Sequence, residues 1–328
     1  MLPIIAKIPR PACARVIAGA LALLATCVHA QIYPAKPIRI VVPFTTGGPN
    51  DILSRLIGHK LTEAWGQQVL VDNRPGGGTV IGTELAAKAA PDGYTLLIVS
   101  PSTATNPSLV RKLPYDTLRD LAPVVLLVTS PNVLAVHPSL PVRSVSDLIG
   151  LARARPGQVT FGSGGNGTST HLAGEILALR GGVKMIHVPY KGASPAALGV
   201  LTGEVSFGFG SILPLMPHIE SRRLRAVAVT SLQRASVLPG VPAAAETLPG
   251  FEASPFHGIT APAGTPKDII LKLNQEIGKI MNAPETRERL AREGTEVRTG
   301  TPEQFGAFLR DEIEKWAKVV KAAGLQAQ

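Results

Sequence analysis

The stretch "VTFGSGGNGTSTHLAGEILAL" (159–179) contains, in one piece, the unit from which the fold of this chain can be predicted. It begins with a short apolar run, 159–163, that is typical of a buried strand. A glycine-rich loop follows, and the residues from Ser169 to Leu179 have the pattern of a helix. A strand that turns through glycines into a helix predicts an α/β protein.

The same unit recurs along the chain in two series. Short apolar runs predict strands at 38–44, 69–73, 94–100, 159–163, 184–190, 205–211 and 224–231. Helices are expected between them, at 50–65, 79–89, 144–154, 169–179 and 193–203. Because most of the apolar runs are continuous rather than alternating, we expect mainly parallel sheets that helices cover on both faces.

Two long segments, 121–138 and 249–266, separate the series and are interpreted as extended crossings between two lobes. Near the C-terminus, 266–281 and 302–324 carry apolar residues at three- and four-residue spacing, which predicts two amphipathic helices. The expected division is a first lobe of 31–130 plus 255–328 and a second lobe of 131–254, with a cleft between them.

The first 30 residues have the features of a secretory signal peptide. Three cations and no acidic residue accompany an apolar run, 16–28, and Val28 and Ala30 stand at the two positions that signal peptidase reads. We therefore expect export to the periplasm, with cleavage after Ala30. A lipid anchor on Cys27 is the alternative, although Thr26 is a poor residue before such a site.

Composition limits the chemistry of the mature chain. Both cysteines, Cys13 and Cys27, lie in the signal segment, so disulfides, thiolate metal sites and cysteine nucleophiles are not expected. The formal net charge of +10 becomes about +7 without the three cations of that segment. The remaining cations are scattered, which argues against nucleic-acid binding and favours attraction of small anions.

Four strand-to-helix junctions are rich in glycine and hydroxyl residues: 43–51, 99–107, 161–171 and 189–195. In parallel α/β sheets, ligands bind beyond the carboxyl ends of the strands. The first amides of a helix have no partner within the helix, and glycine lets the backbone approach a ligand closely. The junctions are therefore candidate anion-binding sites.

The loop 161–170 resembles two nucleotide motifs without completing either. Its glycines at 162, 164 and 167 match G-x-G-x-x-G, but the next strand ends in Tyr190-Lys191 rather than in an acid. A P-loop requires a lysine where this chain has Thr168. Two interpretations stay open beside nucleotide binding: the glycines merely turn a strand into a helix, or they hold a carboxylate with backbone amides and hydroxyls.

Signals for catalysis are weak. The chain contains neither G-x-S-x-G nor H-E-x-x-H, and we expect no cofactor and no metal. His171 and Glu175 have the i, i+4 spacing of two metal ligands, which more often marks a local polar contact. A triad of Ser163, His171 and Asp51 has no support from spacing.

Several long motifs together resemble the solute-binding proteins of tripartite tricarboxylate transporters, also called the Bug family. They are "YPAKPIRIVVPFTTGGPND", "VDNRPGGGTVIGTELAAKAAPDGYTLL", "FGSGGNGTSTHLAGEIL", "HVPYKGASPA" and "APAGTP", which occur in the family's order over nearly the whole mature chain. The resemblance implies a periplasmic binding protein of the two-lobed, type II-like class. It also implies a small organic acid as ligand and the membrane subunits of a transporter as partners.

The resemblance implies that the ligand carboxylate is held by the loop after the first strand and by the glycine-rich loop, and that "PYKG" contributes. The expected ligand contacts are Phe44, Gly47, Gly48, Asp51, Ser100, Ser163, Gly164, Asn166, Gly167, Thr168, His171, Tyr190, Lys191, Ser211 and His257. Asp51 is expected to cap or orient its helix rather than touch the anion. Tyr190 and His257 have packing roles as an equal alternative. Valine at Gly164 or Gly167 is expected to abolish binding with limited loss of stability.

The chain departs from the family at two places. Ser206 and Gly210 stand where relatives often have aspartates, and Pro255-Phe256-His257 stands where an aromatic pair is usual. If these positions line the cleft, the loss of acidic groups favours a non-amino carboxylic acid as the ligand. We expect a monomer that closes on its ligand by hinge bending. A sensor that signals to a membrane kinase and an exported hydrolase on a similar scaffold remain alternatives.

Overall fold

The computed structural model describes residues 33–190, 192–322 and 324. From Lys36 onward the chain forms one compact unit. The expected signal peptide with Cys27, and the expected ligand contact Lys191, lie outside the described residues. Within the described ranges, no helix combines the length and the apolar character that crossing a bilayer would require.

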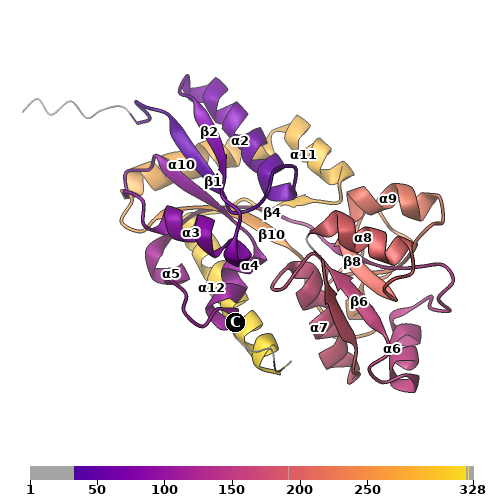
Figure 1. Cartoon of the computed structure of the whole chain (residues 1–328). Helices are drawn as coiled ribbons and strands as arrows, with labels where there is room; N and C mark the ends of the chain where they lie inside the picture. The colour runs from indigo at the N-terminus through magenta and orange to yellow at the C-terminus, as the bar shows by residue number, and fades with distance from the viewer. Residues whose placement is uncertain (1–32, 191, 323, 325–328) are drawn as a thin grey trace, which may run out of the picture. The chain divides into compact units, whose positions relative to one another are not determined.

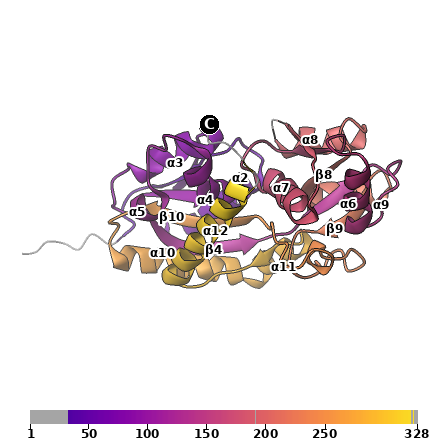
Figure 2. The same cartoon turned by 90° about the horizontal axis from the view of Figure 1, so that it is seen from below.

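The first sheet is built from six strands (Figure 1). Their order is β11 (Glu296–Val297), β4 (Leu121–Thr129), β10 (Phe256–Pro262), β3 (Thr95–Val99), β1 (Ile38–Val42) and β2 (Val69–Asn73). The helices that accompany it are α2 (Pro49–Trp65), α3 (Val80–Ala87), α4 (Pro101–Leu109), α5 (Thr117–Asp120), α10 (Lys267–Asn282), α11 (Pro284–Arg292) and α12 (Pro302–Ala322), with the short 3-10 turn η1 (Gly77–Thr79). Figure 2 shows α3 and α10 on opposite sides of β4 and β10. Helices therefore cover both faces, as predicted.

The second sheet has five strands in the order β7 (Ile186–Pro189), β6 (Thr160–Ser163), β8 (Phe207–Ser211), β5 (Asn132–Val136) and β9 (Arg225–Val229). Its helices are α6 (Val145–Ala154), α7 (Ser169–Gly181), α8 (Ala193–Leu201) and α9 (Ile212–Glu220), and η2 (Ala244–Glu246) follows β9. Successive β5 residues belong to different cores: Leu134 packs with the cluster that includes α6 and α7, and Val133 with the cluster that includes α8 and α9. This alternation is that of a strand buried on both faces.

The expectation of mainly parallel sheets needs correction, because both sheets are mixed. In the first sheet β1 pairs in parallel with β2 and β3, while β10 is antiparallel to β3 and β4. In the second sheet β6 pairs in parallel with β7 and β8, while β5 is antiparallel to β8 and β9. The antiparallel strands adjoin the crossings. β10 and β5 each enter their sheet from the other sheet. Because the carboxyl ends of β3 and β8 face the other sheet, the entering strand runs antiparallel to them.

Both predicted crossings contain strands. β4 and β5 occupy most of the segment 121–138, and β10 occupies the middle of 249–266. The chain changes sheet at Ser130 and again near Pro255, where the amide of Ser130 donates to the carbonyl of Pro255 at 3.0 Å. The two crossings therefore lie side by side and are joined by a backbone hydrogen bond.

The helices α4, α5, α9 and α11 were not predicted, and α4 shows most clearly why. Residues 101–109 look like a loop because they are rich in Pro, Ser, Thr and Asn, yet they form α4. Ser100 caps this helix and Pro101 occupies its first turn, where the missing N–H costs nothing. The side chains from Pro101 to Asn106 are buried. Burial in the tertiary structure therefore overrides a weak intrinsic helix propensity.

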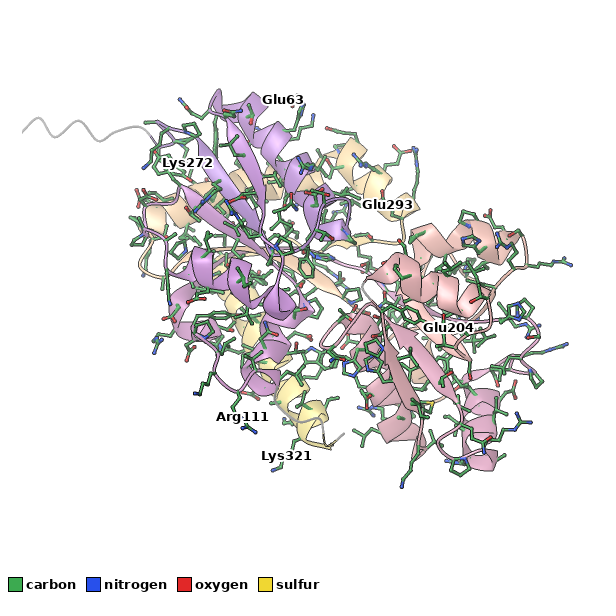
Figure 3. The ribbon with its side chains drawn as sticks, viewed as in Figure 1. Glu63, Arg111, Glu204, Lys272, Glu293 and Lys321 are labelled. Atoms are coloured by element: carbon green, nitrogen blue, oxygen red, sulfur yellow. The ribbon has the colours of Figure 1, made fainter. Side chains whose placement is uncertain are left out.

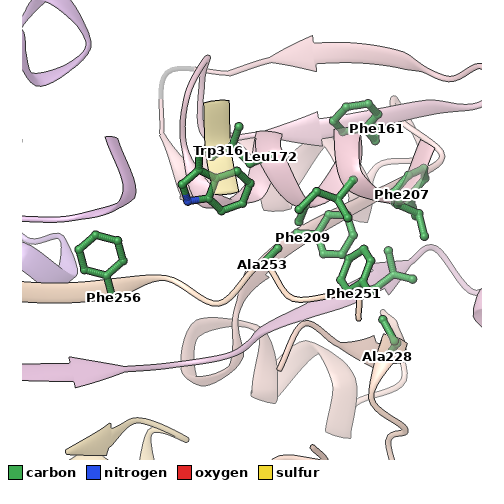
Figure 4. Close-up of a cluster of buried hydrophobic side chains, with 14 of the residues drawn as sticks. Phe161, Leu172, Phe207, Phe209, Ala228, Phe251, Ala253, Phe256 and Trp316 are labelled. Carbon is green, nitrogen blue, oxygen red and sulfur yellow. The ribbon is translucent and has the colours of Figure 1, made fainter. Parts of the chain in front are cut away.

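A continuous apolar core joins elements of both sheets. Its members include Phe161, Leu172 and Phe207 from the second sheet and its helices, and Phe256 and Trp316 from the first sheet and α12. Figure 4 shows Trp316 beside Leu172, so the C-terminal helix α12 inserts its indole against α7. The C-terminal helix therefore holds the two parts of the structure together.

Charged side chains are spread over the outside. Figure 3 shows Glu63, Arg111, Glu204, Lys272, Glu293 and Lys321 on the exterior of the ribbon. They come from separate helices and loops. This dispersion agrees with the scattered cations of the sequence.

Candidate functional site

The predicted junctions of the first sheet meet at one edge. β1 and β3 are parallel neighbours, so the loops that lead into α2 and α4 leave the sheet at the same edge. β10 runs antiparallel to β3 and pairs Gly258 with Val99, which brings His257 level with Ser100. The structure thus gathers Phe44, Gly47, Gly48, Ser100 and His257 around the start of two helices.

Asp51 organises the loop that precedes it. Its Oδ2 accepts from the amide of Gly47 at 2.9 Å and from Arg55 Nε at 3.0 Å. Burial alone would raise the pKa of Asp51, but the hydrogen bonds from Arg55, Gly47 and Asn73 outweigh burial and lower it. Asn73 also donates to the carbonyl of Phe44 at 3.1 Å. The carboxylate therefore engages the Gly47 amide, which fits a structural role rather than contact with an anion.

The start of α2 retains unused donor capacity. Gly48 is the cap residue and has no side chain to accept from the first-turn amides, and Pro49 follows it. A helix start without a side-chain cap is suited to receive an anion, because its amides and the helix dipole both favour negative charge.

The glycine-rich loop before α7 is held by side chains of its own segment. The amide of Gly164 donates to Thr170 Oγ1 at 3.0 Å, and the amide of Gly165 donates to Ser163 Oγ at 3.1 Å. The amide of Gly167 donates to His171 Nδ1 at 3.1 Å. These three amides are engaged in this conformation, which the sequence did not reveal.

The remaining residues of this loop divide by exposure. Thr168 caps α7, accepting from the amide of His171 and donating to the carbonyl of Gly165 at 2.7 Å. Asn166 is exposed at the tip of the loop. Asn132, at the start of β5, donates to Ser169 Oγ at 3.2 Å. The outward part of the loop and the first turn of α7 are therefore the parts positioned to meet a ligand.

The two groups of junctions touch through α4. Thr105 Oγ1 donates to the carbonyl of Gly167 at 3.4 Å. The φ of Gly167 is +74°, a left-handed conformation that favours glycine, and a side chain there would also meet Leu109. The glycine-rich loop thus adjoins a helix of the first sheet, as a site between two lobes requires.

His187 is a half-buried neighbour of this loop that sequence reasoning missed. Its Nε2 lies 2.6 Å from Ser163 Oγ, and its ring stacks on His171 with 4.0 Å between centroids. The parallel register of β6 and β7, which pairs Phe161 with His187, would have indicated this proximity. Burial, and secondarily the charge of His171, lowers the pKa of His187 to about 4.

Two other expected ligand contacts, Tyr190 and Ser211, are placed by packing and by strand pairing. The ring of Tyr190 packs against Gly162 and Gly199, which have no side chains to exclude it. Ser211 is the cap residue of α9 without a side-chain cap hydrogen bond, and it pairs in register with Asn132. Tyr190 therefore fits the packing alternative better than a ligand contact.

The two positions where relatives have aspartates do not both lie at the junction edge. Ser206 precedes β8, at the end of the strand opposite the junctions, and bonds to Thr160. A side chain at Gly210 would meet Leu215 of α9. These replacements therefore give no support to the expected preference for a non-amino acid.

A cavity of about 300 Å³ lies elsewhere, between α7 and α12, and is lined by Ile176, Leu179, Arg180, Gly250, Glu252, Lys315, Lys318, Val319 and Ala322. None of these residues belongs to a strand-to-helix junction. We assign the candidate site to the junctions because free helix starts and left-handed glycines gather there, whereas this cavity is a groove between two packed helices.

His257 is buried and is held by Asn50, whose Oδ1 lies 2.9 Å from His257 Nδ1. Burial lowers the pKa of His257 to about 4. In the unfolded chain the imidazole of His257 is therefore protonated below about pH 6.5, whereas in the folded chain it is protonated only below about pH 4. The contribution of His257 to the free energy of unfolding is fully present above this pH range. It is lost as the pH falls through the range, by about 3 kcal/mol for a fully buried group.

We expect the variant His257→Gln to show a smaller fall in melting temperature than the wild type between about pH 7 and 4.5. The replacement does not titrate, so its contribution to the slope disappears even if the fold is weaker at pH 7. Thermal melts followed by circular dichroism measure this. His59→Gln, at an exposed histidine of α2, is the matched control and should keep the wild-type slope. If the melting temperatures of both variants fell equally with pH, the pH dependence could not be assigned to His257.

Comparisons with known proteins show which family the chain belongs to. The family model described as "Tripartite tricarboxylate transporter family receptor" matches residues 53–325. Protein BugT of Bordetella pertussis is 40% identical over 304 residues, which cover 92% of this chain and 93% of BugT. The predicted Bug-family resemblance is confirmed by these matches.

Two solved structures share the fold. The structure of R. palustris Rpa4515 with adipate has a TM-score of 0.83 and 35% identity, covering 90% of this chain and 100% of that chain. MatC from Rhodopseudomonas palustris with bound malate has a TM-score of 0.79 and 29% identity, covering 88% of this chain and 100% of that chain. The two-lobe α/β class is thereby confirmed. The chain belongs to the family of tripartite tricarboxylate transporter receptors.

Proposed function

We propose that this chain is a periplasmic solute-binding protein that captures a small organic carboxylate between two lobes and delivers it to a tripartite tricarboxylate-type transporter. The observation that carries the proposal is the contact between the two groups of junctions, where the glycine-rich loop before α7 meets α4 through Thr105 and Gly167. The adipate and malate in the similar structures support a dicarboxylate as the ligand class.

Backbone amides can supply the affinity without an arginine. Each hydrogen bond to a charged group contributes about 1.5–3 kcal/mol, and a helix start adds about 0.3–2 kcal/mol. Micromolar affinity corresponds to about 8 kcal/mol. Four or five donors from the starts of α2 and α7 would therefore suffice after the cost of association.

The predicted lobes, 31–130 plus 255–328 and 131–254, are proposed to move about the paired crossings. The hydrogen bond from Ser130 to Pro255 places both crossings next to each other, where small backbone rotations would change the angle between the sheets. We further propose that residues 1–30 direct export and are removed after Ala30, and that the mature protein is a monomer.

The hydrolase alternative is disfavoured by burial. Ser163 is the hydroxyl closest to a histidine in this loop, yet its exposed fraction is 0%. A nucleophile must reach the substrate, so this serine cannot attack without rearrangement of the loop. Binding without catalysis is what we propose. A sensor role would use the same binding site and differ in the membrane partner.

A thermal-shift screen of purified mature protein tests the proposal. The acids are adipate, malate and citrate, with glutamate, lysine and the dimethyl ester of adipate for comparison. A true ligand at a hundredfold its Kd should stabilise the protein by about 2.7 kcal/mol and raise the melting temperature, and the ester should give no shift. Mass spectrometry should show every acid and ester unchanged. Absence of any shift, or consumption of the ester, would refute the proposed function.

A further inference from the structure

Asp51 places a negative charge inside the helix start where the proposed function requires an anion to bind. It is the third residue of α2, and its side chain is only 4% exposed. Although burial acts to raise its pKa, the hydrogen bonds from Arg55 and Gly47 keep the pKa of Asp51 below its ordinary value, so it is charged at neutral pH. Because like charges repel, a bare carboxylate in this turn would oppose the capture of a carboxylate ligand. The helix start therefore needs a cation that compensates Asp51.

Arg55 compensates this charge from one turn further along α2. Its Nε donates to Asp51 Oδ2 at 3.0 Å, and its Nη2 lies 2.9 Å from Asp51 Oδ1. The planar guanidinium thus faces both oxygens of the carboxylate, which is the strongest geometry for such a pair. Arg39 of β1 and Arg74 after β2 pair with Asp72 instead. Among the residues that the structure describes, Arg55 is therefore the cation that neutralises Asp51.

The guanidinium of Arg55 is also linked to both ends of the loop 44–47. At one end, Asp51 Oδ2 accepts from the amide of Gly47 at 2.9 Å. At the other end, Arg55 Nη2 donates to Asn73 Oδ1 at 3.2 Å, and Asn73 Nδ2 donates to the carbonyl of Phe44 at 3.1 Å. One side chain thus connects Arg55 to each end of the loop, which fixes the backbone that leads into α2.

Arg55 differs from an ordinary surface arginine because its partner is buried. The side chain of Arg55 is 54% exposed, and an ion pair between two exposed groups contributes little to stability. Removal of Arg55, however, would leave the buried carboxylate of Asp51 without a counter-charge. Asp51 would then be free to turn toward water and away from Gly47. The loss would therefore fall on the loop and on the charge at the helix start.

We propose that Arg55 is a positioning residue for carboxylate capture, which neutralises Asp51 and clamps the loop 44–47 so that the start of α2 can accept an anion. Arg55 acts through Asp51 and Asn73 and does not touch the ligand. The effect on capture rests on the proposed function, whereas the clamping of the loop does not.

Hydrogen exchange of the full mature protein, resolved for single amides and without a ligand, tests the clamp. The key variant is Arg55→Gln, because glutamine removes the charge and is a good helix former at an exposed position. At pH 7 the amide of Gly47 should exchange about tenfold faster in this variant than in the wild type. The helix 145–154 should keep its protection in both proteins. An unchanged exchange rate at Gly47 would overturn the clamp.

Arg74→Gln is the matched control. The side chain of Arg74 is 52% exposed and pairs with Asp72, so the replacement removes the same charge from a neighbouring position. Long-range electrostatic attraction of an anion is therefore reduced to a similar extent in both variants. Arg74→Gln should keep the wild-type exchange rate at Gly47 and the wild-type affinity. An equal effect of both variants would overturn the proposal, because the net charge alone would then explain it.

Calorimetry at pH 7 tests capture, with adipate as the probe, or with malate if adipate gives no heat. Arg55→Gln should weaken the affinity about tenfold. In an Asp51→Asn background the same replacement should change the affinity less than about threefold, because no charge remains to be compensated. Asn Oδ1 can still accept from the amide of Gly47 in this background.

Three outcomes of the calorimetry would contradict a proposal. Unchanged affinity in Arg55→Gln would overturn the role of Arg55 in capture. A loss of about tenfold in both backgrounds would overturn it as well, because Arg55 would then contact the ligand itself. Absence of binding by every acid to the wild type would instead refute the proposed function and leave the exchange rate of Gly47 to decide the clamp.

Discussion

Trp316→Ala is expected to lower the free energy of unfolding by about 3–5 kcal/mol, the largest stability loss that we predict. The exposed fraction of Trp316 is 0%, and its ring fills the core where α12 meets α7. Its Nε1 also donates to Glu312 Oε2 at 2.8 Å, so truncation removes one partner of a buried carboxylate. Both the cavity and the lost hydrogen bond act in the same direction.

Urea denaturation followed by far-UV circular dichroism measures this loss, since fluorescence would change with the number of tryptophans. The matched control is Trp65→Ala on α2, a partly buried tryptophan, which should cost clearly less. A loss below about 1 kcal/mol for Trp316→Ala would show that α12 is not anchored through this side chain.

Gly167→Val is expected to abolish carboxylate binding and to destabilise the fold. Its φ of +74° is strained for any residue with a Cβ and worst for a β-branched one. The added Cβ would also lie 3.3 Å from Leu109 Cδ1 and 3.5 Å from Thr105 Oγ1, against α4. The sequence-based expectation of limited stability loss therefore needs revision at this position.

Gly164→Val separates binding from stability. Gly164 has no left-handed φ, and a Cβ there would first meet the backbone of Gly192 at 3.4 Å, an ordinary contact. We expect this variant to fold with limited loss and to lose binding, because the larger side chain occupies the space between the starts of α7 and α8. Gly150→Val on α6, where a Cβ meets nothing within 4 Å, is the control and should bind normally. Calorimetry measures the affinity of each variant, and denaturation measures its stability. Unchanged affinity in Gly164→Val would place the anion elsewhere.

Local patterns predicted many elements well. The run "VLVDN" forms β2 over the predicted residues, and the Ser-x-x-Asp start of α6 forms a capping box in which Ser144 and Asp147 bond reciprocally. These features depend on neighbours in sequence, so the residues themselves report them. α4 could not be predicted in this way, because its Pro, Ser and Thr residues become helical through burial against α12.

The candidate site was predicted at the level of loops. The loops containing Gly47 and Gly167 do begin helices at sheet edges. Their individual hydrogen bonds were not predictable, since the partner of the Gly167 amide is a ring nitrogen four residues away and the partner of Ser163 is on another strand. Whether these residues bind the ligand as predicted is what the Gly164 and Gly167 variants test.

The sequence by itself determined the α/β class, the order of most elements, the glycine-rich helix starts and the family, because each depends on residue type and short-range spacing. The tertiary structure decided the mixed strand directions, the helix α4, the insertion of Trp316 against α7 and the stacking of His171 on His187. These features arise where segments distant in the chain pack together. Their energies come from burial and from hydrogen bonds between residues that no local pattern places side by side.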